Sequence, residues 1–239
     1  WIVFLDCDEY FSEESIPLIK QCINNLSRNK DINGIVCELI NIDLNKNVIS
    51  TVKNVSARIF RNKNYIKYKN KVHEVLFNEK RDNNQLLCFE EKKLKILHTG
   101  YDKNIIIDKN KNNRNIKILQ DELSSDVTNP QINLYLSKQY YLDKQYDKSL
   151  HYAKLALDYA NENTNNMYCL IYSSILYTML TLNKSYDEMR DVFDEAIIKD
   201  NDYPDYYRAM AMAAFREKKI KQAIDYFEKC LYYCENYNK

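Results

Sequence analysis

Glycine and proline are scarce in this chain: its 239 residues include only 2 glycines and 3 prolines. Average usage is roughly 7% glycine and 5% proline, and both residues serve mainly in turns and loops. A collagen-like chain is therefore excluded, and a complete, turn-rich α/β enzyme is hard to reconcile with so few turn residues. We expect most of the chain to be helical.

Long apolar runs and an excess of one charge are also missing. Lysine plus arginine number 35 against 34 for aspartate plus glutamate, a net charge of +1. No global field therefore favours nucleic acid or an anionic membrane, and we predict no nucleic-acid partner. No apolar run approaches the roughly 18 residues that a membrane-spanning helix needs. A hydrophobic content of 45% nevertheless suffices for a folded core.

The 7 cysteines are scattered, and none of them forms a Cys-x-x-Cys pair. This pattern predicts reduced, packed thiols and a cytoplasmic protein.

The sequence changes character near residue 100. Before it, short β-branched runs alternate with polar breaks, and Ser12 precedes an apolar helical pattern that extends to about Arg28. The expected strands are Trp1 to Leu5, Gly34 to Ile40, Ser56 to Phe60, Val72 to Phe77, Leu86 to Phe89 and Leu94 to Leu97. Residues 1–101 therefore form an α/β segment.

A helical pattern begins after Tyr101 and continues to the end of the chain. We expect a linking helix within residues 102–128, and Asn129-Pro130 then opens a new helix with proline in its first turn. Within residues 129–239, Ala156, Ala196 and Cys230 recur at a spacing of about 34 to 40 residues, which indicates stacked helical hairpins. These units resemble the tetratricopeptide repeat, and we expect most of the 21 tyrosines to pack between helices.

An apolar strand ends in the acidic run Asp6-Cys7-Asp8-Glu9. In an extended segment, alternate residues point to one side, so Asp6 and Asp8 would face the same way. Two such carboxylates can hold Mg²⁺ or Mn²⁺ against a diphosphate, although solvated strand ends also carry this pattern.

Histidine is rare, and two of the 3 histidines, His73 and His98, lie at expected strand ends in the first half of the chain. His73 is followed by Glu74, so a proton carrier or metal ligand stands beside a carboxylate.

The ordered series W-I-V-F-L-D-C-D-E, R-I-F-R-N, K-V-H-E-V-L and I-L-H-T-G-Y, followed by helical repeats, resembles family 2 glycosyltransferases of the GT-A fold that carry C-terminal tetratricopeptide repeats. Members of this family in bacteria modify lipopolysaccharide cores or bacteriocin peptides. The resemblance implies an α+β chain, with a partial GT-A catalytic segment before an all-α repeat domain. It also implies an inverting, metal-dependent transfer of sugar from a nucleotide-diphosphate sugar to a protein, peptide or glycolipid acceptor.

The resemblance also assigns roles to particular residues. Glu74 or His73 would act as the base, and the nucleotide sugar would be bound by Asp6, Arg58 and Arg61. The Mn²⁺ or Mg²⁺ ion would be held by Asp8, Asp6 and His98. The roles of Glu74, His73 and His98 are interchangeable at this stage. The repeats would bind the acceptor or join two copies into a homodimer.

The family places its nucleotide-binding strands before the acidic motif, whereas only five residues precede Asp6 here. We therefore expect a fragment without transferase activity of its own. The alternative is a tetratricopeptide-type protein-binding module whose α/β part is a non-catalytic scaffold.

Overall fold

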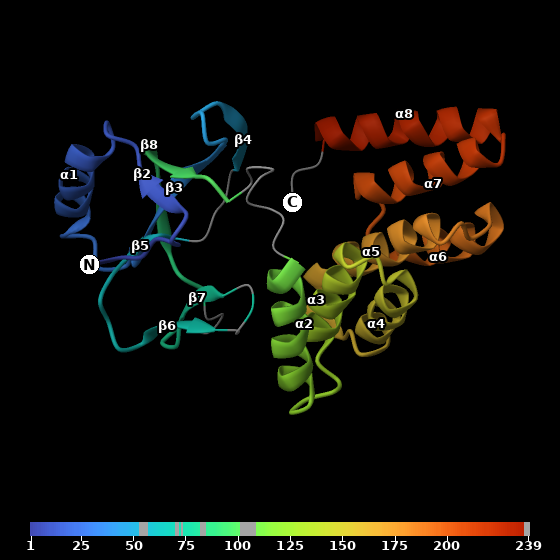
Figure 1. Ribbon diagram of the computed structural model, residues 1–239, viewed down its shortest axis with the longest axis horizontal. Helices are drawn as coiled ribbons and strands as arrows, with labels where there is room; N and C mark the ends of the chain where they lie inside the picture. Colours follow the sequence, from blue (N-terminus) through green and yellow to red (C-terminus); the bar gives the residue numbers. More distant parts are fainter. Residues whose placement is uncertain (53–56, 70–71, 73, 82–84, 101–108, 237–239) are drawn as a thin grey trace. The chain divides into compact units, whose positions relative to one another are not determined.

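A computed structural model describes residues 1–52, 57–69, 72, 74–81, 85–100 and 109–236. The chain divides into two compact units, Trp1–Lys109 and Asn110–Lys239 (Figure 1). The first is built around a curled sheet and the second is helical, so the protein has a mixed α+β fold.

The first unit contains one helix and a six-stranded sheet with the order β1-β5-β3-β8-β2, in which β4 pairs with β3. A separate hairpin joins β6 to β7. Among the described residues, β3 and β8 form the parallel pair, and the other pairings are antiparallel. The elements are β1 (Ile2–Val3), β2 (Glu9–Phe11), α1 (Ile16–Leu26), β3 (Gly34–Ile42), β4 (Val48–Val52), β5 (Ile59–Phe60), β6 (Ile66–Lys69), β7 (Val75–Asn78) and β8 (Cys88–His98).

Helix α1 packs its apolar side on this sheet. Cys22 and Leu26 join a buried cluster with Ile35 and Leu39 of β3 and Ile96 of β8. The helix begins at Ile16, later than the expected start after Ser12. The reason is that the Ser15 hydroxyl accepts a hydrogen bond from the backbone N–H of Lys95 at 2.8 Å, which ties this turn to β8.

Two of the expected strands, those beginning at Leu86 and at Leu94, form one strand in the structure. Both runs contribute to the single strand β8, whose pairing with β3 skips Lys92 to Leu94 at a register shift and then resumes at Lys95. The sequence pattern also missed β2, β4 and β6. Strand β4 is exposed along its whole length, so it lacks the apolar alternation that reveals a strand.

The second unit opens with α2 (Lys109–Leu123), which lies within the expected linking segment. Three helical hairpins follow, α3 with α4, α5 with α6, and α7 with α8 (Figure 1). Their bounds are α3 (Pro130–Leu142), α4 (Tyr146–Asp158), α5 (Tyr168–Thr181), α6 (Tyr186–Lys199), α7 (Pro204–Arg216) and α8 (Ile220–Asn236), with a short 3₁₀ helix (Glu162–Met167) before α5. Helix α3 begins at Pro130 as predicted, and the Asn129 side chain caps it by accepting hydrogen bonds from the N–H groups of Gln131 and Ile132.

The aligned positions of the sequence repeat lie in the core of this unit. Ala153, Ala156 and Ala196 are completely buried, and Cys230 is buried in the equivalent place on α8. The extra spacing between the first two repeats is taken up by the 3₁₀ helix. The structure therefore confirms a helical repeat.

Each hairpin turn holds one residue with positive φ, namely Lys144, Asn183 and Lys218. At each turn the N–H of the next residue reaches the carbonyl five positions back, as from Lys219 to Ala214 at 2.9 Å. The left-handed residue itself donates to the carbonyl three positions back, as from Lys218 to Phe215 at 3.0 Å. These two hydrogen bonds and the left-handed residue form a Schellman motif, in which glycine is the usual choice. The chain therefore makes its helix turns without glycine.

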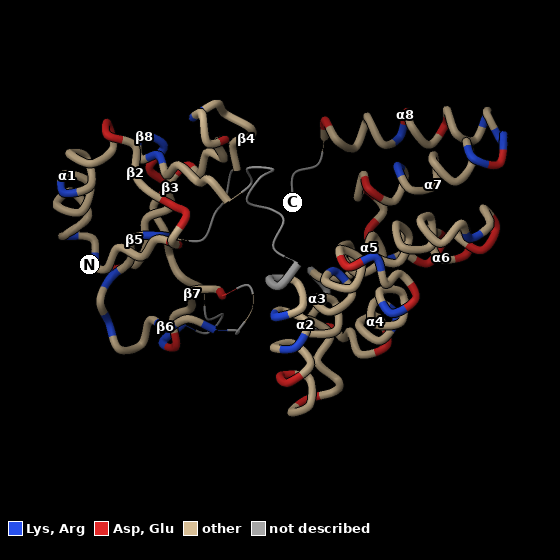
Figure 2. The backbone as a smooth tube through the Cα atoms, viewed as in Figure 1, with Lys and Arg blue, Asp and Glu red and all other residues tan. Residues whose placement is uncertain are grey.

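Surface charges of both signs are interspersed along α4, α6 and α8 (Figure 2), in keeping with the small net charge. All seven cysteines are free thiols. In the part of the chain that the structure describes, no helix is both long and apolar enough to cross a membrane.

Candidate active site

The acidic run forms a tight turn between β1 and β2. The N–H of Glu9 donates to the carbonyl of Asp6 at 3.0 Å, and the N–H of Thr99 donates to the carbonyl of Asp8 at 3.0 Å. The expectation of an extended segment is therefore wrong, because the first of these bonds closes the chain into a turn. As a result, Asp6 and Asp8 have different partners.

Asp6 belongs to an ion-pair network centred on Arg58. The Arg58 guanidinium donates to Glu9 through Nε, at 2.8 Å from Oε2, and through Nη2, at 2.5 Å from Oε1. Its Nη2 also lies 3.0 Å from Asp6 Oδ2. The Glu9 side chain is 2% exposed and that of Asp6 is 53% exposed, so the network runs from the interior to the surface.

Burial lowers the pKa of Arg58, but the hydrogen bond and the charge of Glu9, together with the charge of Asp6, outweigh burial and leave this pKa raised. Arg58 therefore stays cationic beside Asp6, with its side chain 15% exposed. Such a planar donor suits a diphosphate oxygen.

Asp8 faces His98, which is 90 residues away in sequence at the end of β8. Asp8 Oδ2 lies 3.2 Å from His98 Nε2, and the other ring nitrogen, Nδ1, lies 2.8 Å from Asn41 Oδ1. We call Asp8 and His98 the carboxylate–imidazole pair. The antiparallel pairing of β2 with β8, in which Glu9 is opposite His98, brings them together.

Asn41 determines which nitrogen of His98 faces Asp8. Its Nδ2 donates to Ser50 Oγ at 2.8 Å, so its Oδ1 is the atom that accepts from His98 Nδ1–H. In the neutral ring, Nε2 then carries a lone pair directed at the Asp8 carboxylate. A proton on Nε2 makes the contact with Asp8 an ion pair, and a cation can take the place of that proton.

Gly100 keeps the space beside this pair open. A Cβ atom at this position would lie closer than van der Waals contact to both Asp8 Oδ2 and His98 Nε2. One of the two glycines in the chain therefore stands where any side chain would press on the two polar atoms.

The carboxylate–imidazole pair has the donor chemistry of a divalent-cation site, because imidazole nitrogens and carboxylate oxygens are both metal ligands. No group of three histidine, cysteine, aspartate or glutamate side chains that could hold a metal occurs among the described residues. A cation here would therefore take its remaining ligands from water and from diphosphate oxygens, as Mg²⁺ and Mn²⁺ commonly do.

Arg61 has other partners. Its Nε donates to the carbonyl of Ile32 at 2.8 Å, its Nη2 donates to the carbonyls of Leu26 and Asn29, each at 2.9 Å, and its guanidinium stacks on Trp1. These contacts fix the C-terminal end of α1. The structure thus does not bring Arg61 to the acidic turn, in contrast to Arg58.

Glu74 is exposed and immediately precedes β7. Tyr68, on the neighbouring strand β6, packs its ring on Phe4 just before the acidic turn. Burial raises the pKa of Tyr68; the charge of Arg58 opposes this shift, and the charges of Asp6 and Glu74 add to it. Glu74 is thus within electrostatic reach of the ring that adjoins the network, whereas His73 lies outside the described residues.

Sequence reasoning missed Asn41 as a functional residue. The available signal was an asparagine inside the apolar run Gly34–Ile42, where a buried amide requires a hydrogen-bonding partner. Asn41 is 3% exposed, and its partner proves to be His98.

The first unit thus carries the carboxylate–imidazole pair, and the second unit is a helical repeat. No family model matches the chain. The chain is 23% identical, over 97% of its length, to the SPbeta prophage-derived glycosyltransferase SunS of Bacillus subtilis strain 168, and equally to glycosyltransferase SunS of Bacillus phage SPbeta. It spans about half, 53%, of the length of these relatives.

The chain is also 30% identical, over 60% of its length, to the ancillary SecYEG translocon subunit of Buchnera aphidicola subsp. Schizaphis graminum, of which it covers 73%. By that identity and that coverage, the matched part of the chain belongs to the same family as this subunit. Among solved structures, this chain resembles MamA with a TM-score of 0.46 and 16% identity, and the match covers 56% of this chain and 74% of MamA. PilF of Pseudomonas aeruginosa has a TM-score of 0.42 and 14% identity, with 52% of each chain covered.

Proposed function

We propose that the chain is part of an inverting, metal-dependent glycosyltransferase of family 2 with a GT-A fold, which moves a sugar from a nucleotide-diphosphate sugar to a protein, peptide or glycolipid acceptor. The observation that carries this proposal is the carboxylate–imidazole pair beside the acidic turn, with Asp8 Oδ2 and His98 Nε2 3.2 Å apart. The similarity to the SunS glycosyltransferases along nearly the whole chain agrees with it.

In this proposal Asp8 and His98 hold the divalent cation, and Asn41 orients the His98 ring through its contact with Nδ1. Asp6 and Arg58 face the diphosphate side, where the guanidinium donates to phosphate oxygens. A bound cation would neutralise the charge that develops on the departing diphosphate.

Glu74 is the proposed base. Its carboxylate takes the proton of the acceptor hydroxyl or thiol while the acceptor atom bonds to the anomeric carbon and the bond from that carbon to the diphosphate oxygen breaks. His73 is the alternative base. The exposure of Glu74 leaves room for an acceptor to approach it.

Metal binding is the first test. Calorimetry of the full chain with Mn²⁺, alone and with a panel of nucleoside diphosphates, is expected to detect binding that Asp8→Asn or His98→Gln abolishes. Asp31→Asn, at an exposed aspartate that precedes β3, is the matched control and should change nothing. Because one ligand is an imidazole nitrogen, Mn²⁺ should bind more tightly than Mg²⁺. Unchanged Mn²⁺ affinity in Asp8→Asn would contradict the proposed site.

Transfer itself is tested by mass spectrometry of candidate acceptors after incubation with the full-length parent and mixed nucleotide sugars. Loss of the mass increase in Glu74→Gln, with Mn²⁺ binding retained, is expected for a base. Equal transfer by this variant would remove Glu74 from that role.

A second candidate function is protein binding by the helical repeat. It is favoured by the match to the ancillary translocon subunit, whose name describes a component of a protein assembly. In that case the α/β unit is a scaffold, and Asp8→Asn has no effect on partner capture.

A further inference from the structure

Strand β4 presents a free edge of the sheet in the first unit (Figure 1). It pairs with β3 and, within the described ranges, with no other strand. All five of its residues are exposed. The backbone N–H and C=O groups on the side away from β3 are therefore open to solvent or to another molecule.

This strand lacks the features that normally protect an edge. Its sequence, Val-Ile-Ser-Thr-Val, contains no charge and no proline (Figure 2). Val48 is 65% exposed, Ile49 is 50% exposed and Val52 is 38% exposed. Because alternate residues of a strand point to opposite faces, Ile49 lies on one face and the two valines lie on the other. Strand β4 thus offers apolar side chains on both faces.

The other free edges of this sheet are short or charged. Strand β1 has two residues and β2 has three. Strand β8 carries Glu90, Glu91, Lys92 and Lys93 beyond the residues that pair with β2. Short strands and charged side chains both oppose pairing with another chain. In the described part of the sheet, β4 is therefore the unprotected edge.

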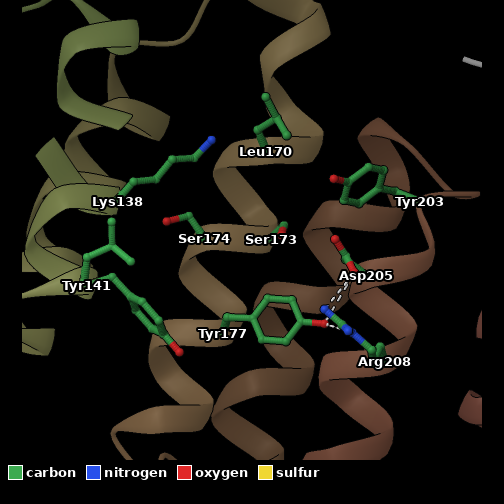
Figure 3. Close-up of a pocket in the computed structure, with 10 residues that line it drawn as sticks. Lys138, Tyr141, Leu170, Ser173, Ser174, Tyr177, Tyr203, Asp205 and Arg208 are labelled. Atoms are coloured by element: carbon green, nitrogen blue, oxygen red, sulfur yellow. Dashed lines mark hydrogen bonds and ion pairs between the residues drawn. The ribbon is translucent and has the colours of Figure 1, made fainter. Parts of the chain in front are cut away.

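Polar groups in the helical unit offer a contrast. In a groove of about 560 Å³, Arg208 lies 3.2 Å from Asp205 Oδ1 and donates through Nε to the hydroxyl of Tyr177 (Figure 3). This cation is satisfied by its neighbours. The edge of β4 instead leaves a row of backbone groups without a partner among the described residues.

An extended polypeptide is the molecule that complements such an edge. Residues advance about 3.4 Å along a strand, so groups on the same side recur about every 7 Å. A second extended chain presents donors and acceptors with the same repeat. A lipid headgroup, a sugar or a metal ion does not present this repeat, and β4 has no charge that would attract an ion.

The position of β4 favours a partner polypeptide over a second copy of this chain. Ser50 Oγ lies 2.8 Å from Asn41 Nδ2, and Asn41 Oδ1 lies 2.8 Å from His98 Nδ1. Two hydrogen bonds thus connect the middle of β4 to the carboxylate–imidazole pair. An enzyme site needs its substrates nearby, whereas a second copy would occupy this edge permanently.

We propose that the free edge of β4 binds an extended segment of a partner polypeptide by strand addition. Ile49 packs against an apolar side chain directly opposite it on the added strand. The centre of the segment is uncharged, because β4 offers no charge to pair with it. The choice of a partner over a second copy rests on the proposed function, whereas strand addition itself rests on β4 alone.

The test uses the full chain and a synthetic library of octapeptides, blocked at both ends and randomised at the central positions. Peptides retained by the immobilised protein are read by mass spectrometry. The preferred peptide is then remade as a fluorescent series in which one backbone nitrogen at a time is methylated, which removes a single hydrogen-bond donor.

Fluorescence anisotropy gives the affinity of each peptide for the natural chain, for Ile49→Lys and for Leu44→Lys. Leu44 is 60% exposed in the turn between β3 and β4, and it is the matched control because it receives the same charge outside the strand. Val48→Lys tests the same edge from the other face if Ile49→Lys proves less stable.

Retained peptides should be enriched in valine, isoleucine and threonine. N-methylation should weaken binding about tenfold or more at alternate positions and less between them, because a strand turns every second N–H toward its neighbour. Ile49→Lys should weaken binding about tenfold, while Leu44→Lys leaves it unchanged and both variants keep the natural melting temperature to within a few degrees. Losses that do not alternate, or equal binding by Ile49→Lys and Val48→Lys, would overturn the proposal.

Sedimentation velocity distinguishes a partner from a second copy. Self-association that Ile49→Lys abolishes, in a chain that retains no peptide, would also overturn the proposal, because it would place a second copy on the edge. The Asp8→Asn chain should bind the peptide as tightly as the natural chain does. Failure of the metal site and failure of the docking edge are therefore distinguishable.

Discussion

Removal of the Glu9 carboxylate should destabilise the first unit selectively. Glu9 accepts two hydrogen bonds from Arg58, at 2.8 and 2.5 Å, and a third from the N–H of Asp6 at 3.2 Å. Glu9→Ala leaves the guanidinium, whose side chain is only 15% exposed, with the largely exposed Asp6 as its remaining carboxylate. Breaking a buried ion pair from one side costs about 3 to 5 kcal/mol. Since Asp6 and some solvent still reach Arg58, we expect a loss of about 2 to 4 kcal/mol in the free energy of unfolding.

The single tryptophan makes this measurement specific to the unit. Trp1 packs against the α1–sheet cluster and stacks with Arg61 at 4.6 Å, so its fluorescence reports unfolding of the first unit. Far-ultraviolet circular dichroism is dominated by the helical repeat and monitors the second unit. Urea unfolding followed by both probes should show the tryptophan transition moving to lower urea in Glu9→Ala, with the main helical transition unchanged.

A double-mutant cycle assigns the loss to the ion pair. Arg58→Met combined with Glu9→Ala should cost less than the sum of the two single changes, by about 1 kcal/mol or more. Glu14→Ala, at an exposed glutamate just before α1, is the control and should change stability by less than about 0.5 kcal/mol. If Glu9→Ala is as mild as this control, or if the two changes are additive, the buried network does not organise the acidic turn.

Three further outcomes are expected. Gly100→Ala places a methyl group against the carboxylate–imidazole pair and should weaken Mn²⁺ binding at least about tenfold by calorimetry, so unchanged affinity would contradict the proposed metal site. Lys218→Gly, at φ 62°, should raise the urea-derived free energy of unfolding by about 0.5 to 1 kcal/mol, whereas Lys229→Gly within α8 should lower it by about 1 kcal/mol. Burial raises the pKa of Tyr177 to about 12, so the folded state keeps this proton after the unfolded chain, with a pKa of about 10, has lost it. Stability should therefore fall as pH rises from about 10 to 12, and less steeply in Tyr177→Phe when both are followed by circular dichroism.

Local patterns were sufficient for the larger elements. The apolar periodicity located α1, and the Asn129-Pro130 pair located the start of α3. The predicted burial of the tyrosines holds for Tyr140, Tyr206 and Tyr207, while Tyr141 is only half-buried. These features depend on neighbours in sequence, which is why sequence alone revealed them.

The site was only partly accessible to such reasoning. Asp8 and His98 were both singled out, but their contact depends on the antiparallel pairing of β2 with β8, and β2 has only three residues. Tertiary structure also explains why Arg58 and Arg61 have different partners. The two arginines flank β5, and only the segments that pack beside them differ. A pattern that treats them as equivalent donors cannot separate them.

The scarcity of glycine predicted helix, which the second unit confirms, but for an incomplete reason. Few glycines suggested few turns, yet the helical unit repeats one tight turn three times, with Lys144, Asn183 and Lys218 in the left-handed conformation. For a side chain with a Cβ atom this conformation costs roughly 1 kcal/mol or more, and the two backbone hydrogen bonds of each motif and the packing of the flanking helices offset that cost. The two glycines that the chain retains have no positive φ. They stand instead where a Cβ would collide, Gly34 against Cys88 and Gly100 against the carboxylate–imidazole pair. Glycine is thus kept for close approach rather than for turning, which is why the Gly100 position bears on the site.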